Sequence, residues 1–221
     1  MIQGKDILEE LKHLVDDPAY SRFFEINRAY RYICRLTAWN WLRRQSDTLI
    51  VFSASTSDYS LNMASMRSLV SIHTKGGTDD RWRLLEETPV SLFEVRKREH
   101  QDANGTDRTA KPLYYKLMGF GASATISVLP KPDQTYSVRV TYILRTPEIE
   151  AEKEVLLPPE YASTIALLAA SYLLERHADP LKQQIAARYK EDALEELQSM
   201  LKNTHPNRTV DLDRKPVNWI Y

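Results

Sequence analysis

Apolar side chains recur at helical spacing near both ends of the chain and at strand spacing in its middle. Toward the start, Ile7 and Leu11 share one face of a short predicted helix. A longer apolar stripe follows and predicts a second helix from about Arg22 to Arg44. The residues of this stripe are Ile26, Tyr30, Ile33, Thr37 and Trp41. Helices are therefore expected in the first part of the chain.

Two further helices are predicted near the other end. The first carries an apolar face and stops near His177; the face consists of Tyr161, Ile165, Leu168 and Tyr172. Asp179 and Pro180 then suit the N-cap and first positions of a last helix, which runs to about Lys202. Its inward residues are expected to be Ile185, Tyr189, Ala193, Leu197 and Met200, and its outward residues Glu191, Asp192, Glu195 and Glu196.

Short segments in the middle of the chain are rich in β-branched and aromatic residues and are separated by turn-forming stretches, which is typical of strands; the clearest of them alternates between apolar and polar residues. The clearest is "TYSVRVTYILR", and "TLIVFSAS", "SLVSIHTK" and "RWRLLEE" are shorter examples. The segments "PLYYKLMGFG" and "ATISVLPKPDQ" are expected to pair next to "TYSVRVTYILR" in an antiparallel meander, with a turn at residues 130–133. The polar stretch "REHQDANGTDRTAKP" has no period and predicts a mobile loop.

The order of these elements predicts an α+β fold. Helices from both ends of the chain form a helical base, an antiparallel β-rich lobe is inserted between them, and an extended C-terminal tail follows. The expected borders are 1–46 for the N-terminal helices, 47–147 for the β-rich lobe, 148–203 for the C-terminal helices and 204–221 for the tail.

The composition of the chain excludes several kinds of binding and several kinds of site. Thirty basic and thirty acidic side chains give a net charge of zero, so no global field draws the chain to nucleic acid or anionic lipid. The single cysteine, Cys34, excludes an intramolecular disulfide and a multi-thiolate metal site, and it flanks an apolar stripe, which indicates burial. No apolar run approaches the roughly 20 residues that span a bilayer, and the charged first residues do not resemble a secretion signal. We expect no membrane association.

Motifs for catalysis, metal binding and cofactor binding are missing from the sequence. The five histidines lack the spacing of zinc ligands, and neither a phosphate-binding loop nor a nucleophile elbow occurs. Gly119, Gly121 and Ala124 match a dinucleotide-binding pattern, but a strand follows where that pattern needs a helix. We expect no catalytic residue, metal or cofactor. The enzyme alternative is a hydrolase with a sugar-binding groove lined by Trp39, Trp41 and Trp82, which requires a carboxylate with a raised pKa.

Three arginines form a basic face on the second predicted helix. Arg28, Arg31 and Arg35 lie opposite its apolar stripe, with the aromatic residues Phe24, Tyr32 and Trp39 nearby. Such a face can neutralise and stack on nucleic acid, which makes a nucleic-acid-binding regulator the alternative function; reversing the charge of Arg31 would then abolish binding. The other interpretation is that the arginines pair with the acidic surface of the last helix or with a neighbouring subunit.

Large apolar side chains follow a polar, proline-containing stretch in "RKPVNWIY". Exposed tail residues are usually small and polar. We therefore expect these large apolar side chains to be buried, either on a partner or on the chain's own helices. The candidate binding segment consists of Pro216, Val217, Asn218, Trp219, Ile220 and Tyr221.

The order of these patterns resembles the head-to-tail adaptor (connector) proteins of tailed bacteriophages. The resemblance runs from about Ser21 to Lys202 and rests on "INRAYRYICRLTAWNWL", "SDYSLN", "PLYYKLMGFGASATISVLPKPDQTYSVRVTY" and "LLPPEYASTIALLAASYLLER". It implies a non-enzymatic virion protein, made in the host cytoplasm and placed at the head-tail junction. Such adaptors form a homo-oligomeric ring, typically a dodecamer, beneath the portal protein.

The resemblance also implies partners. The ring would extend the channel through which genomic DNA passes and would offer a docking platform for tail or nozzle proteins. C-terminal tails of such adaptors commonly reach the portal, so residues 216–221 would form a portal-binding tail. The face of Arg28, Arg31 and Arg35 would then contact either a neighbouring subunit or DNA.

Overall fold

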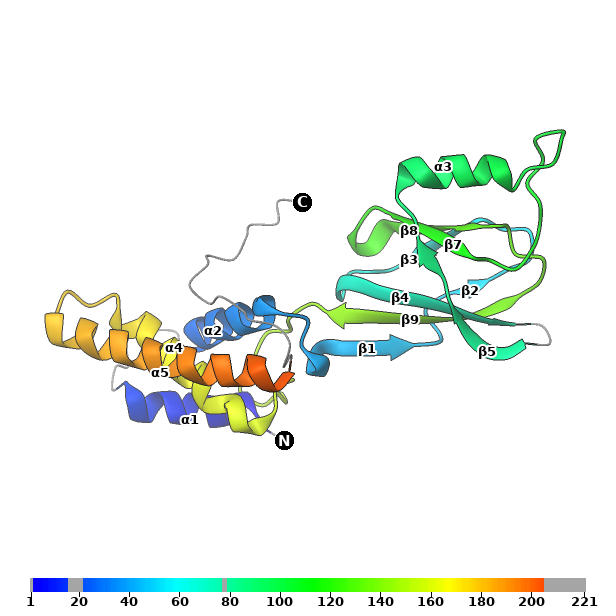
Figure 1. Cartoon of the computed structure of the whole chain (residues 1–221). Helices are drawn as coiled ribbons and strands as arrows, with labels where there is room; N and C mark the ends of the chain where they lie inside the picture. The colour runs from blue at the N-terminus through cyan, green and yellow to red at the C-terminus, as the bar shows by residue number, and fades with distance from the viewer. Residues whose placement is uncertain (1, 16–21, 77–78, 205–221) are drawn as a thin grey trace. The chain divides into compact units, whose positions relative to one another are not determined.

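The computed structural model describes residues 2–15, 22–76 and 79–204, which fall into two compact units (Figure 1). The helical unit consists of the described residues up to Leu42 together with those from Thr146 onward. The β unit is the continuous segment Arg43–Arg145. Helices from the two ends of the chain thus share one unit and the sheets lie in the other, which confirms the predicted α+β class.

The helical unit is built around α4. Its elements are α1 (Gly4–Leu14), α2 (Arg22–Leu36), the 3-10 turns η1 (Asn40–Leu42) and η3 (Pro159–Tyr161), α4 (Ala162–Leu174) and α5 (Pro180–Thr204). Ten residues of α4 are buried, because α1, α2 and α5 all pack against it. Among the helices in the described ranges, none has both the length and the apolar composition needed to cross a bilayer.

The helix α2 ends earlier than its apolar pattern predicts. It stops at Leu36, and Arg43 and Arg44 belong to a strand instead. The reason lies in Trp39, which is fully buried and donates its indole Nε1–H to the carbonyl oxygen of Ile33 at 2.7 Å. That carbonyl is in the last turn of α2, where carbonyl groups have no helical partner. The indole therefore satisfies the helix end.

The helix α5 begins and packs largely as predicted. The Asp179 carboxylate accepts a hydrogen bond from the Leu181 backbone N–H at 2.9 Å, as an N-cap residue does. Ala193 is buried with Leu197 and Met200, but Ile185, expected inward, is 37% exposed. Glu196 was expected to face solvent. It instead accepts a hydrogen bond from the Thr164 hydroxyl of α4 at 2.5 Å, because that hydroxyl needs an acceptor inside the helix pair.

The β unit contains two sheets and one helix. Its strands are β1 (Arg43–Ser46), β2 (Val51–Phe52), β3 (Asp58–Leu61), β4 (Met66–Gly76), β5 (Asp79–Leu84), β6 (Glu86–Glu87), β7 (Tyr114–Met118), β8 (Ala124–Leu129) and β9 (Tyr136–Leu144). One sheet has the order β1-β9-β4-β5, with β2 also pairing with β9, and the other has the order β3-β8-β7-β6. The β6–β7 pair is parallel and the other pairs are antiparallel.

The predicted meander is correct for β7 and β8 and wrong for β9. β7 pairs with β8, whereas β9 lies in the other sheet between β1 and β4. Residues 130–133 thus carry the chain from one sheet to the other. The physical reason is the apolar surface that both strands carry: Ile126 and Val128 of β8 share one buried cluster with Val138 and Val140 of β9. Strands in separate sheets can bury these faces against each other.

The buried face of β9 changes along the strand. Tyr136, Val138 and Val140 are buried as the alternation predicts, but further along Ile143 is buried and Tyr142 only partly so. The pairing of β9 with β4 carries two irregularities beside these last residues. Such bulges change which side chains face the core, and the sequence pattern does not mark them.

A helix of the β unit was not predicted. The helix α3 (Val90–Glu99) packs against β7, where Phe93 is its one buried residue. The Arg96 guanidinium lies 3.9 Å from the centre of the Tyr114 ring, and the Lys116 ammonium lies 2.7 Å from the Glu94 carboxylate. Cationic side chains thus connect α3 to β7 in addition to the buried Phe93 ring.

The polar stretch after α3 is a loop, as predicted, but hydrogen bonds and an ion pair hold it in place. The Asp102 carboxylate accepts hydrogen bonds from the backbone N–H groups of Asn104 and Thr106, at 2.9 and 2.8 Å. The Asp107 carboxylate lies 2.9 Å from the Lys131 ammonium. The Asp102 hydrogen bonds order the loop internally, and the Asp107–Lys131 pair connects it to the segment after β8.

Acid should weaken one contact between β3 and β8. Burial alone would raise the pKa of Asp58, but hydrogen bonds from the Ser127 and Ser57 hydroxyls and the charge of Lys116 outweigh it and lower the pKa. A lowered pKa means stability that is present above the ordinary value of about 3.9 and is lost as the pH falls through the folded-state value. The variant Asp58→Asn should therefore show a weaker loss of stability below about pH 4 than wild type. Urea unfolding across a pH series measures this, and two parallel pH profiles would contradict it.

Candidate functional site

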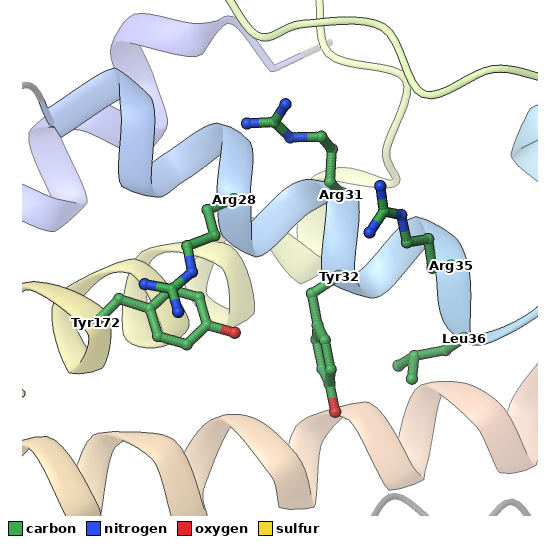
Figure 2. Close-up of a pocket in the computed structure, with 6 residues that line it drawn as sticks. All are labelled: Arg28, Arg31, Tyr32, Arg35, Leu36 and Tyr172. Carbon is green, nitrogen blue, oxygen red and sulfur yellow. The ribbon is translucent and has the colours of Figure 1, made fainter. Parts of the chain in front are cut away.

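Three arginines of α2 line a cavity in the helical unit. Its volume is about 370 Å³. The side chains around it, which we call the arginine pocket, are Arg28, Arg31, Tyr32, Arg35, Leu36 and Tyr172. Figure 2 shows Arg28 lying across Tyr172 of α4, while Tyr32 points from α2 toward α5.

The spacing of the arginines follows from the packing of α2. Ile26, Tyr30 and Ile33 are buried on the side of α2 that faces the core. Residues three and four apart share a helix face, so Arg31 and Arg35 follow Arg28 along the opposite side. All three arginines therefore line one cavity, with the Arg28 guanidinium against Tyr172, while the side chains of Arg31 and Arg35 point away from Tyr32 and Tyr172 (Figure 2).

Arg28 is held in place from two directions. Its guanidinium lies 4.1 Å from the centre of the Tyr172 ring and 3.4 Å from the Glu25 carboxylate. Glu25 is buried and also pairs with Arg176 of the loop after α4. Burial raises the pKa of the Tyr172 hydroxyl, and the Arg28 charge only partly opposes this. Tyr172 therefore presents a neutral hydroxyl to the cavity at physiological pH.

The aromatic neighbours differ from those predicted. Tyr32 lines the cavity and Phe24 is 55% exposed on the same helix. Trp39, also expected beside the arginines, is fully buried and stacks on Trp41 with ring centres 4.3 Å apart. Sequence reasoning did not place Tyr172 at this site, although it placed this residue on an apolar face of α4.

The arrangement is suited to binding an anion. Arginine guanidinium groups bind carboxylates and phosphates through paired hydrogen bonds, and tyrosine hydroxyls add neutral donors. Leu36 and the Tyr32 and Tyr172 rings supply apolar walls. We therefore assign the arginine pocket as the candidate binding site for a carboxylate-bearing or phosphate-bearing partner.

The tryptophan groove of the hydrolase alternative does not form. Trp39 has no exposed surface and cannot line a groove. Trp82 belongs to β5 of the β unit, where the Arg139 guanidinium lies 4.1 Å from the centre of its ring. Within the described residues, no group of three or more histidine, cysteine, aspartate or glutamate side chains could hold a metal ion. Cys34 is buried in the helical unit, as its place beside the apolar stripe predicts.

The candidate portal-binding tail cannot be placed. Residues 216–221 lie outside the described residues, so the structure gives no position for this segment.

Comparisons with known proteins extend these observations. No curated protein matches the chain. Among solved structures, the chain is similar to the "Neck of native GTA particle computed with C12 symmetry", at 18% identity over 84% of this chain and 88% of that chain. It is also similar to the "Neck of empty GTA particle computed with C6 symmetry", at 16% identity over 83% and 87% of the two chains. The TM-score is 0.25 in both cases, too low to carry an argument about this chain.

A protein family matches nearly the whole chain. The match covers residues 4–212 and is to the family described as "SU10 adaptor protein". It includes all the described helices and strands of both units. The resemblance to phage adaptor proteins that the sequence predicts is thereby confirmed, and the chain belongs to the SU10 adaptor protein family.

Proposed function

We propose that the protein is a head-to-tail adaptor, a non-enzymatic component of a phage virion. Copies of the chain form a ring beneath the portal protein, extend the DNA channel and provide the docking platform for the tail. The observation that carries the proposal is the family match over residues 4–212. Such a ring, typically a dodecamer, would sit at the head-tail junction.

The division into two units supports a joining role. An adaptor must contact an assembly on either side, and the chain provides two compact units with separate cores, one helical and one made of sheets. Each unit can therefore serve a different partner surface. We propose the helical unit as the base of the ring and the β unit as the surface offered to tail or nozzle proteins.

The overall charge is compatible with a DNA channel. A strongly basic wall would bind phosphates and release counterions, which would hold DNA in place. The chain has equal numbers of basic and acidic side chains. A ring of such subunits could let genomic DNA pass without trapping it.

Residues 216–221 are proposed as the portal-binding tail. Burying Trp219, Ile220 and Tyr221 on a partner would contribute about 1.5 to 3 kcal/mol each. Ordering each backbone residue costs about 1 to 2 kcal/mol, so a single tail binds weakly. In a ring the tails act together, because the first contact raises the effective concentration of the others.

Co-sedimentation with the portal ring of the same genome tests the proposal. We expect the full chain to pellet with the portal ring and a version ending at Thr204 to lose most of this binding. The matched control keeps residues 216–221 and replaces 205–215 by a glycine-serine linker of equal length; it should still bind. Equal binding of the full and shortened chains would contradict only the proposal that residues 216–221 bind the portal. If neither form binds an intact portal ring, the adaptor proposal itself is wrong.

A further inference from the structure

Two arginines of α2 point to the same side of this helix, away from the tyrosines of the arginine pocket (Figure 2). Arg35 is exposed and Arg31 is half-buried. The Arg31 Nε–H is donated to the Asn27 carbonyl oxygen of the same helix at 3.2 Å, and its terminal amino groups carry further donors for a carboxylate. We call Arg31 and Arg35 the arginine pair. They are four residues apart, which places them about 6 Å apart along the helix axis.

The helices α2 and α5 end at the same end of the helical unit (Figure 1). Trp41, shortly after α2, lies beside Tyr161, which directly precedes α4; their ring centres are 6.4 Å apart. Glu196, in the second half of α5, accepts a hydrogen bond from the Thr164 hydroxyl in the first turn of α4. The start of α4 is thus next to the end of α2 and to the last part of α5. The chain that continues from α5 therefore starts close to the arginine pair.

Two carboxylates occur in the segment that follows α5. The helix is described to Thr204, and residues 205–221 lie outside the described part of the chain. The acidic residues of this segment are Asp211 and Asp213, in "TVDLD". An extended chain rises about 3.3 Å per residue, so residues 205–211 can span about 23 Å. In the same conformation Asp211 and Asp213 lie on one side, about 6.6 Å apart. This spacing matches that of the arginine pair.

We propose that residues 209–213 of the chain's own tail dock on α2, with the Asp211 carboxylate on Arg35 and the Asp213 carboxylate on Arg31. The direction follows from the arrival of the tail at the end of α2, where Arg35 comes before Arg31. The docked segment is a strap that holds the first part of the tail on the helical unit. Residues 216–221, proposed to bind the portal, lie beyond the strap and are not part of this contact.

The short connection favours the chain's own tail over DNA or a separate protein as the occupant. Exposed ion pairs are individually weak. A segment joined to the same unit by six residues, however, has an effective concentration on the order of millimolar. Any other anionic partner has to displace it. The arginine pair offers paired donors to carboxylates, so two aspartates at matching spacing can both be bound.

Trypsin cleavage of the full-length chain measures the docking. Trypsin cuts after Arg208 and Arg214, which flank the strap. The protease acts on the undocked segment, so the cleavage rate reports the undocked fraction. We expect both bonds to be cut at least about fivefold more slowly in the full-length chain than in a synthetic peptide of residues 204–218. Higher salt should reduce this protection.

Variants of both partners test which side chains are responsible. Arg31→Glu and Arg35→Glu should each raise the cleavage rate at least about threefold, because each places a carboxylate against an aspartate. The matched control is Arg188→Glu at an exposed position of α5, which should be cleaved like wild type. The double variant Asp211→Asn, Asp213→Asn should lose most of the protection relative to a peptide with the same two changes. Circular dichroism first establishes that each variant is folded.

Cysteine cross-linking tests whether both partners belong to one chain. Arg35→Cys combined with Asp211→Cys should form a disulfide within the chain on mild oxidation, located by peptide mapping. The control pair Arg188→Cys with Asp211→Cys should form one at least about tenfold more slowly, because the strap does not bring these positions together. Cys34 is buried and is common to both variants.

Four results would overturn the proposed strap. Two of them are equal cleavage rates for the full-length chain and the peptide, and equal rates for the α2 variants and Arg188→Glu. Protection that disappears on dilution, or a disulfide between two chains, would assign the tail contact to a neighbouring copy. Salt-sensitive binding of duplex DNA that Arg31→Glu abolishes, with tail cleavage unchanged, would assign the arginine pair to nucleic acid. The portal protein is absent from these experiments, so their outcome is independent of the co-sedimentation test of the adaptor proposal.

Discussion

Replacing Trp39 by alanine is expected to lower the free energy of unfolding of the helical unit by about 3 to 5 kcal/mol. The indole is fully buried, stacks on Trp41 and donates a hydrogen bond to the last turn of α2. The variant therefore loses apolar burial, leaves a cavity and leaves the Ile33 carbonyl without its partner. Urea unfolding followed by circular dichroism measures the loss.

Two further variants separate the causes. Trp39→Phe keeps much of the buried ring but lacks the indole N–H, so its free energy of unfolding should fall less than that of Trp39→Ala. Trp82→Ala removes a tryptophan from the β unit and should leave the stability of the helical unit unchanged. A loss below about 1 kcal/mol for Trp39→Ala would show that the indole does not stabilise the end of α2.

Replacing Asn27 by leucine should lower the free energy of unfolding by about 2 to 5 kcal/mol, although the two side chains are similar in size. The Asn27 amide joins α2 to a segment far along the chain. Its oxygen accepts a hydrogen bond from the Ile149 N–H at 2.6 Å, and its nitrogen donates to the Ile149 carbonyl at 3.0 Å. Leucine cannot replace either bond, so both buried backbone groups of Ile149 would lose their partners.

The thermal unfolding midpoint and urea unfolding together check the effect of Asn27→Leu. The matched control is Asn40→Leu, because Asn40 is exposed and the same substitution there should change stability by no more than about 0.5 kcal/mol. Equal effects of the two substitutions would mean that the amide does not hold the segment around Ile149 to α2.

The helices were the most predictable part of the fold. α1 and the first part of α2 each bury one face, so their apolar residues recur at helical spacing. Asp179 and Pro180 marked the start of α5 through local backbone chemistry alone. Such features depend on neighbours in sequence, and sequence patterns can therefore carry them.

The errors arose where the deciding contact leaves no trace in the periodicity of apolar residues. The end of α2 depends on Trp39 folding back onto Ile33, whereas periodicity alone continues the helix. Alternation marks β8 and β9 as strands but does not say that they belong to different sheets. The helix α3 was not predicted because it lacks a buried apolar stripe. It buries only Phe93 and leaves Val90, Leu92 and Val95 exposed.

The candidate site was predictable in part. Helical spacing alone places Arg28, Arg31 and Arg35 on one face. The cavity, however, also needs Tyr172, which lies more than a hundred residues away in sequence and reaches the site only because α4 packs against α2.

The pairing of β1 with β9 bears on how such proteins can diverge. β1 is the first strand of the β unit and β9 is its last, and Arg43 lies opposite Ile143 in their antiparallel ladder. The chain therefore enters and leaves this unit at neighbouring points, as in tolerated domain insertions. Under the proposed function, exchange of the whole segment for another with adjacent ends would adapt a phage to a different tail while the sequence of the helices stays the same.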